Sequence, residues 1–222
     1  MTSLLFPIGW AVLGAGAGWL ARWGSVKLAR LEGLEPGFKP WQVYGPPILC
    51  ALLFGVFAWH LEIGHLLVLM ERSAFIAVLV QMIFFDLEHR LILDRVMFPS
   101  MVAALILSLF NQPWWAGLAT GVGVGALFFG LEVAGEALFK GEVLGFGDVK
   151  LAAFMGLLLG WDGGPGNGIP IVNALFLGLV LGAIAAIGVG IWRRSMKATF
   201  AYGPYLAAGA LIVLYQLPEQ IL

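Results

Sequence analysis

Two aspartates stand at the edges of long apolar runs, where a carboxylate could do acid–base chemistry. Asp86 follows the run that ends with Phe84 and Phe85, and Asp148 precedes the run that begins at Val149. Burying a carboxylate near a membrane is costly unless the group is partnered or protonated, so acids in such places are candidates for function. Two carboxylates at one depth could share a proton, with one acting as base on a water and the other protonating the leaving group.

Gly145 and Gly147 flank Phe146 just before Asp148. Glycine permits unusual dihedral angles and a close approach of another backbone. An extended substrate could lie against this segment and hydrogen-bond to it, as in strand addition. Peptide hydrolysis in a membrane needs an extended substrate, because a helix hides its scissile carbonyl. We therefore expect Gly145 and Gly147 to shape a substrate-facing loop.

Each aspartate also has a purely structural interpretation. Asp148 could stabilise a helix N-terminus, where a carboxylate is favoured, with Lys150 nearby. Asp86 could be the first solvated residue after a membrane helix. If the two form a pair, Asp148 at a helix N-terminus should lose its proton before Asp86 at a helix C-terminus.

Several neighbouring polar residues are lesser candidates for groups that support the site. Asp94 could support it, or it could cap the helix that starts beside it. Glu132 and Glu136 are one helical turn apart and share a helix face. They could be interfacial charges or groups that support the site. Lys150 is a further supporting candidate. His89 lies in a charged segment and is expected to be solvated.

The composition indicates a helical membrane protein. The 222 residues are 61% hydrophobic and 11% charged, and the mean hydropathy is +0.95. Soluble domains carry about 25% charged residues, so an ordinary soluble globule and a nucleic-acid binder with a basic face are both excluded. Cys50 is the single cysteine, so these residues contain no internal disulfide and no multi-cysteine zinc site.

Apolar runs predict the helices, since a membrane helix needs about 20 mostly apolar residues. Eight runs qualify, two of them short: residues 4–21, 46–60, 66–85, 96–110, 114–137, 149–161, 169–192 and 200–217. We expect an all-α, polytopic membrane protein with about eight transmembrane helices. Residues 1–222 are expected to form a single membrane domain, with a short cytoplasmic loop at 22–45.

The cations predict the orientation, because cytoplasmic loops are rich in Lys and Arg. With the N-terminus outside, all of the 12 Lys and Arg except Arg72 fall on the internal side. We therefore expect both termini to be external and both Asp86 and Asp148 to be cytoplasmic. The third run then delivers Asp86 at its inner end, and the sixth begins beside Asp148.

Three segments together resemble the type IV prepilin peptidases, which are GxGD-type intramembrane aspartic proteases. Residues 141–151 (GEVLGFGDVKL) look like the family's signature. Residues 85–90 (FDLEHR), followed by Asp94, are similar to its first catalytic segment. Residues 200–210 (FAYGPYLAAGA) resemble its last-helix motif. The segments occur in family order along the chain.

The resemblance implies a function and a location. Family members remove the short basic leader from prepilins and pseudopilins at the cytoplasmic face of the bacterial inner membrane. The catalytic aspartates map to Asp86 and Asp148. Proteolysis needs no cofactor or metal, and the partners are precursor proteins and membrane lipids, not nucleic acid. Many bacterial members also methylate the new N-terminus with S-adenosylmethionine.

Two departures concern zinc and methylation. Many members carry two Cys-x-x-Cys pairs in the first cytoplasmic loop, and here residues 22–45 contain no cysteine. The family's Tyr-Pro-x-x-Glu segment is replaced by residues 44–49 (YGPPIL), which lack the glutamate. We therefore expect no zinc and weak or absent N-methylation.

Two other classes of protein remain open. A transporter or channel would use intramembrane acids to bind ions. A catalytically idle subunit of a pilus or secretion system would not need both aspartates. The presence of Asp86 and Asp148 together favours the peptidase.

Overall fold

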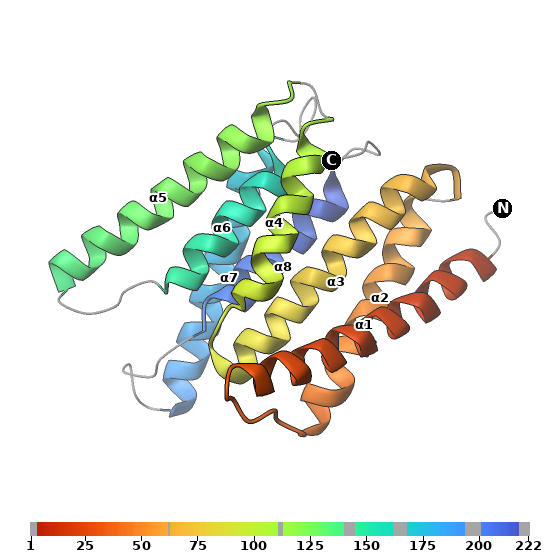
Figure 1. Ribbon diagram of the computed structural model, residues 1–222, viewed down its shortest axis with the longest axis horizontal. Helices are drawn as coiled ribbons and strands as arrows, with labels where there is room; N and C mark the ends of the chain where they lie inside the picture. Colours follow the sequence, from red (N-terminus) through yellow and green to blue (C-terminus); the bar gives the residue numbers. More distant parts are fainter. Residues whose placement is uncertain are drawn as a thin grey trace. The chain divides into compact units, whose positions relative to one another are not determined.

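The computed structural model describes residues 4–61, 63–110, 113–139, 145–161, 168–193 and 201–217. Within these ranges the regular structure is helical, with eight α-helices and one short 3-10 helix (Figure 1). The elements are α1 (Leu5–Leu31), α2 (Pro40–Leu61), η1 (Ile63–His65), α3 (Leu66–His89), α4 (Asp94–Ser108), α5 (Ala116–Phe139), α6 (Phe146–Leu159), α7 (Pro170–Arg193) and α8 (Gly203–Gln216). The described residues confirm the expected all-α fold.

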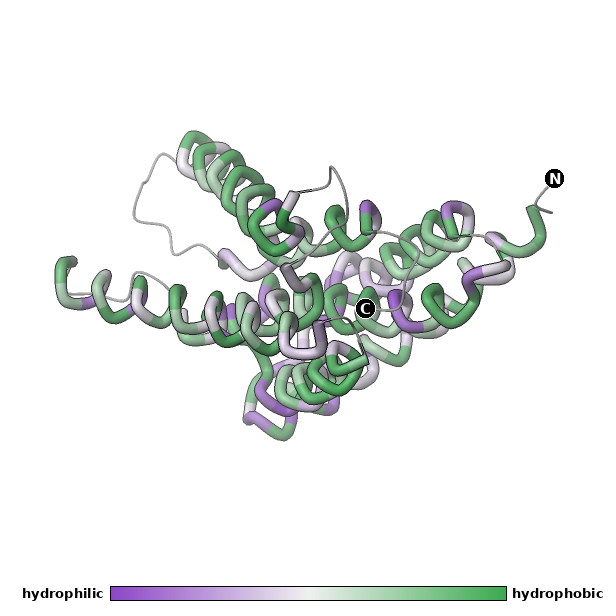
Figure 2. Tube along the Cα trace, turned by 90° about the horizontal axis from the view of Figure 1, so that it is seen from above, coloured by the Kyte–Doolittle hydropathy of each residue, from purple (hydrophilic) through white to green (hydrophobic). Residues whose placement is uncertain are grey.

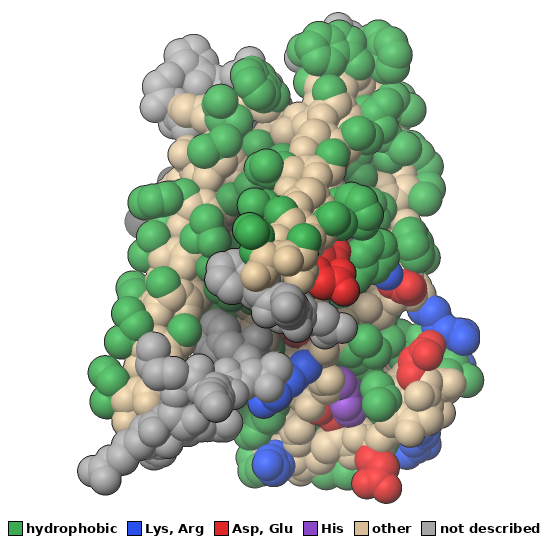
Figure 3. All heavy atoms as spheres, turned by 90° about the vertical axis from the view of Figure 1, so that its left-hand side faces the viewer, with side chains coloured by type: hydrophobic (Ala, Val, Ile, Leu, Met, Phe, Trp, Pro, Cys, Tyr) green, Lys and Arg blue, Asp and Glu red, His purple; other side chains and the backbone are tan. Residues whose placement is uncertain are grey.

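Length and composition identify several membrane-spanning helices among the described residues. Four stretches are long and apolar enough to cross a membrane: Pro40–Leu61, Ile63–His89, Ala116–Leu138 and Pro170–Ile191. Hydrophobic residues predominate along most helices (Figure 2), and hydrophobic side chains cover much of the surface seen in Figure 3. Helices that are hydrophobic all round are typical of membrane spans. The chain is a multi-pass membrane protein; the number of about eight spans and the external termini stay predictions.

The chain divides into two compact units with a boundary between Leu91 and Ile92. The first unit contains α1, α2 and α3, and each of these helices packs against the other two. The second contains α4 to α8, where α6 contacts every other helix of the unit. Asp86 belongs to the first unit and Asp148 to the second. A single domain over residues 1–222 stays a prediction.

Small residues allow α1 to pack closely on α2. Gly14 and Gly18 are one turn apart in α1 and both are buried. A Cβ atom on Gly14 would lie 2.6 Å from the carbonyl oxygen of Cys50, and one on Gly18 would lie 2.5 Å from that of Pro46. Such contacts are possible only without a side chain, which is how membrane helices often approach each other.

The second unit repeats this packing at two helix pairs. α5 and α6 meet at Gly156, where a Cβ atom would lie 2.8 Å from the Cα atom of Gly121. α7 and α8 meet at Gly178, where a Cβ atom would lie 2.8 Å from the Cα atom of Leu206. The 31 glycines of the chain thus include several whose identity is set by backbone contact.

The stretch 22–45, expected as a loop, is largely helical. α1 continues to Leu31, and α2 already begins at Pro40. Proline is favoured at the first helical position because it lacks the N–H that would have no partner there. The N–H of Lys39 donates to Oε1 of Gln42 at 2.8 Å. This is one of the two bonds of a capping box, in which a Gln or Glu at the third helical position accepts from the N–H of the N-cap residue. These local start signals, rather than hydropathy, decide where α2 begins.

Candidate active site

Asp86 lies in the last turn of α3, and only 6% of its surface is exposed. α3 ends at His89, and the following residue, Arg90, adopts the left-handed conformation with φ 55°. The N–H of Arg90 donates to the carbonyl oxygen of Asp86 at 2.8 Å, which closes the turn that carries Asp86. The alternative expectation, a solvated Asp86 after the helix, is therefore wrong.

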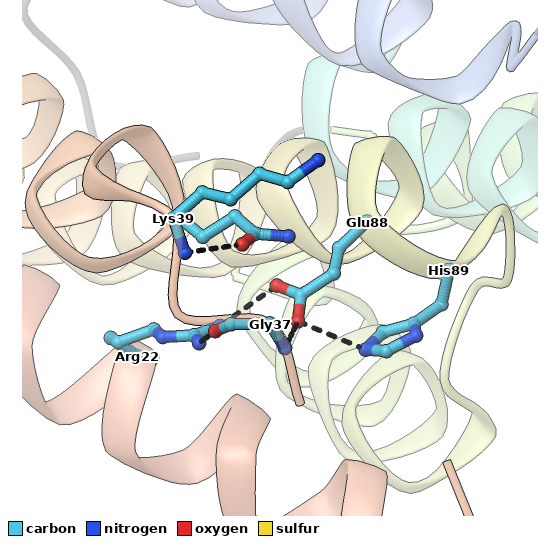
Figure 4. Close-up of polar contacts among 6 residues, drawn as sticks. Arg22, Gly37, Lys39, Glu88 and His89 are labelled. Carbon is cyan, nitrogen blue, oxygen red and sulfur yellow. Dashed lines mark hydrogen bonds and ion pairs between the residues drawn. The ribbon is translucent and has the colours of Figure 1, made fainter. Parts of the chain in front are cut away.

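A buried ion-pair network surrounds Glu88, two residues after Asp86 (Figure 4). Nη1 of Arg22 donates to Oε2 of Glu88 at 2.8 Å, and the two side chains are 7% and 5% exposed. The N–H of Gly37 donates to Oε1 of Glu88, and the carbonyl oxygen of Gly37 accepts from Nη2 of Arg22. Nε2 of His89 lies 3.3 Å from Oε1 of Glu88, with 10% of the side chain exposed, so the expectation of a solvated His89 is wrong.

Asp148 lies in the first turn of α6 and is half-buried. Gly145 is the N-cap of α6, and its backbone hydrogen-bonds the Asp148 carboxylate. Burial raises the pKa of Asp148 to about 6, and the hydrogen bond from Gly145 opposes this rise. Burial thus outweighs the stabilisation of the charged carboxylate by the Gly145 hydrogen bond. The order in which Asp148 and Asp86 ionise stays a prediction.

Tyr202, the N-cap of α8, is a residue that sequence reasoning did not place in the site. Tyr202 lies close enough to Asp148 for the two residues to interact electrostatically. The Tyr202 hydroxyl donates to the carbonyl oxygen of Leu179 at 3.2 Å. The sequence feature that could have pointed to Tyr202 is its place in the motif at 200–210. Nothing in the spacing of the residues predicts that it lies near Asp148.

The two glycines before Asp148 have different surroundings. A Cβ atom on Gly147 would lie 3.1 Å from Cβ of Ile92, which is tighter than ordinary contact. A Cβ atom on Gly145 would meet, among described atoms, only Oδ2 of Asp148, at 3.7 Å. Packing therefore explains Gly147, whereas a Cβ atom on Gly145 would make only an ordinary contact with the Asp148 carboxylate among the described atoms. A substrate-facing role for both stays a prediction.

Asp94 and Lys150 form an ion pair within the second unit. Nζ of Lys150 donates to Oδ1 of Asp94 at 2.5 Å, and it also lies over the rings of Phe98 and Phe146. Asp94 is the first residue of α4, and no side chain caps that helix, so the expected cap is wrong. Lys150 links the first turns of α4 and α6, and the turn of α6 is the one that carries Asp148.

Glu132 lies in α5 and is half-buried. Its Oε2 atom is buried and has no hydrogen-bond partner among the described residues. Glu136, one turn further, is exposed. The supporting role of Glu132 stays a prediction. Within the described ranges, no three His, Cys, Asp or Glu side chains gather as a group that could hold a metal ion.

Parts of two sequence motifs lie outside the described residues. These are residues 141–144, at the start of the signature, and Phe200, at the start of the last-helix motif. The described parts of both motifs place Asp148 at the start of α6 and Tyr202 at the start of α8.

The profile of the type IV leader peptidase family matches residues 73–191, which is more than half of the chain. The chain belongs to this family. The match contains both Asp86 and Asp148 and all the supporting candidates, and it confirms the resemblance drawn from the motifs. Tyr202 and Arg22 lie outside the matched residues.

Several curated relatives are named prepilin leader peptidase/N-methyltransferase. The protein from Dichelobacter nodosus is 34% identical over 178 residues, which cover 76% of this chain and 56% of the relative. That from Aeromonas salmonicida (strain A449) is 34% identical over 140 residues, covering 62% and 46%. That from Stutzerimonas stutzeri is 25% identical over 178 residues, covering 75% and 56%. This chain thus spans about half the length of these relatives, and no solved structure matches it significantly.

Proposed function

We propose that this protein is an intramembrane aspartic endopeptidase that removes the leader peptide from prepilin-like or pseudopilin precursors. The observation that carries the proposal is the family match, because it includes two aspartates in terminal turns of helices. Prepilin-like substrates are proposed because the relatives are named prepilin leader peptidases. The raised pKa of Asp148 further supports acid–base chemistry, since such shifts are frequent at catalytic sites.

In the proposed mechanism Asp86 and Asp148 act as one catalytic pair. One carboxylate takes a proton from the attacking water, and the other, protonated, faces the scissile carbonyl and later protonates the leaving amine. We place the extended substrate backbone against Gly145, which lies close to Asp148 and has no side chain. The Lys150–Asp94 ion pair supports the turn that carries Asp148. No metal or other cofactor takes part in this hydrolysis.

We place the site at the cytoplasmic face of the bacterial inner membrane. The distribution of Lys and Arg along the chain supports this orientation, with both termini outside. Membrane lipids are then the surroundings of the exposed apolar side chains, and the leader and the start of the precursor helix approach from the cytoplasm. No nucleic acid partner is proposed.

Purified protein in detergent, mixed with a synthetic prepilin, tests the function directly. We expect release of the leader, seen as a smaller product by mass spectrometry, and the same rate after treatment with EDTA. An inert protein would refute the peptidase and favour a transporter or an idle assembly subunit. Loss of cleavage on chelation, restored by added zinc, would refute the metal-free mechanism.

The pH profile should follow Asp148, whose pKa burial raises from 3.8 to about 6. Below that pH the carboxyl group is protonated and cannot act as a base, so kcat/KM should fall as the pH drops through about 6. Coupled carboxylates titrate as a pair, and the profile reports apparent values for both. Cleavage rates measured from pH 4.5 to 8 check this. A rate that stays constant down to pH 4.5 would contradict it.

N-methylation should be weak or absent, although the relatives' names include a methyltransferase. Residues 44–49 lack the glutamate found in the family's segment, and residues 22–45 lack the cysteines. S-adenosylmethionine is needed only if methylation is retained. Mass spectrometry of cleaved substrate after incubation with S-adenosylmethionine decides the matter. A product heavier by one methyl group, at yields similar to cleavage, would contradict the prediction.

A further inference from the structure

The carboxylate of Glu88 joins three segments of the first unit (Figure 4). Oε2 accepts from Arg22 of α1, and Oε1 accepts from the N–H of Gly37 in the connection between α1 and α2. Arg22 in turn donates to the carbonyl oxygen of Gly37. Glu88 therefore binds the N–H of Gly37, and Arg22 binds its carbonyl oxygen. Because Glu88 belongs to α3, these bonds join α3 to α1 and to the connection.

The burial of this network makes its contacts depend on one another. The side chains of Arg22 and Glu88 are 7% and 5% exposed, so water replaces little of what is lost when either is changed. A buried charge whose partner is removed is left uncompensated, which is why such pairs respond strongly to substitution. The guanidinium also has the fork geometry needed to reach Glu88 and Gly37 together, which a single ammonium group lacks.

The sequence of the connection is compatible with these contacts at Gly37 and Gln42. Gly37 has no side chain, and a Cβ atom there would collide with the side chain of Gln42. Gln42 is 7% exposed and is held by the N–H of Lys39, the residue before α2. The segment that Glu88 binds is therefore fixed at the start of α2 as well.

Glu88 shares the last turn of α3 with Asp86. Residues two positions apart project from nearly opposite sides of a helix, and Glu88 projects toward α1 and the connection. The N–H of Arg90 closes the same turn on the carbonyl oxygen of Asp86. A constraint on Glu88 thus reaches Asp86 through the backbone of the turn that they share.

We propose that Glu88 is a positioning residue, which ties the end of α3 to Arg22 and Gly37 and so fixes the catalytic Asp86. This inference rests on the proposed peptidase function. It assigns a role to residues 32–39, the connection between α1 and α2: this strap holds the end of α3 in place. His89, 3.3 Å from Oε1 of Glu88, adds a fourth group to the network when it is protonated.

The test combines kinetics with hydrogen exchange on the full chain in detergent. Glu88→Gln should lower kcat about 10-fold or more, since small displacements of a catalytic group have large effects. KM should change less than about threefold, because Glu88 does not touch the substrate. Amide exchange in residues 32–39, followed by mass spectrometry, should become faster in the variant. Arg22→Gln should behave alike, and the double variant should lose no more than either single one.

A matched control is Glu35→Gln, which removes an exposed carboxylate from the same connection and should leave kcat and exchange unchanged. If Glu88→Gln does not fold, Arg22→Lys tests the same point, since it keeps the charge but loses the fork.

Unchanged kcat and exchange in the folded variant would overturn the proposal. A raised KM with normal kcat would also overturn it, because Glu88 would then contact substrate. Faster exchange in Glu88→Gln, with no cleavage by the wild-type protein, would retain the strap but refute the peptidase function.

Discussion

Asp86→Asn and Asp148→Asn will each abolish release of the leader peptide while leaving the protein folded. Each substitution keeps the size of the side chain and removes its ability to take or give a proton. General acid or base catalysis contributes about 10²–10⁴-fold to a rate, so cleavage should fall by at least this amount. Asn has almost the same shape as Asp, so the buried position of Asp86, which is 6% exposed, should accommodate it.

Single-turnover cleavage of a synthetic prepilin by the purified variants measures this loss. Glu35→Gln serves as the control, since Glu35 is an exposed acid outside the proposed catalytic pair. Circular dichroism and thermal unfolding establish that the variants are folded. Cleavage within a few-fold of wild type by either variant would remove that aspartate from the catalytic role.

Gly156→Ala should destabilise the protein by about 1–3 kcal/mol, the usual cost of overpacking a closely packed site. The new Cβ atom would lie 2.8 Å from the Cα atom of Gly121 and from the carbonyl oxygen of Thr120. Both are backbone atoms, so α5 and α6 must move apart. Because α6 carries Asp148 in its first turn, cleavage at elevated temperature should fall together with stability.

The same substitution at Gly123 provides a control with the opposite sign. Gly123 lies in α5, where a Cβ atom would meet nothing within 4 Å. Alanine is the better helix former by about 1 kcal/mol, so Gly123→Ala should leave stability unchanged or raise it. Thermal unfolding in one detergent compares the two variants. Equal midpoints for Gly156→Ala and wild type would contradict the proposed packing of α5 on α6.

Hydropathy predicted the helices well, because a continuous apolar run can satisfy its backbone in a membrane only by forming a helix. Each of the eight expected runs corresponds to a helix of the described residues. The main difference is at residues 22–45, where polar side chains suggested a loop. There Arg22 is buried in α1 by its pairing with Glu88, and Pro40 starts α2 early. Hydropathy averaged over a window of residues reflects neither the ion pair of Arg22 nor the helix start at Pro40.

The sequence by itself determined the fold class, the family and the two candidate aspartates, because these follow from composition and from short motifs. The tertiary structure decided which side chains pair. Glu88 binds Arg22 and Gly37, which are 66 and 51 positions away, and Lys150 binds Asp94, 56 positions away. It also decided the raised pKa of Asp148, since burial outweighs the hydrogen bond from the backbone of Gly145. Contacts between distant residues depend on how helices pack, and that packing is set by backbone approach at glycines such as Gly18 and Gly156.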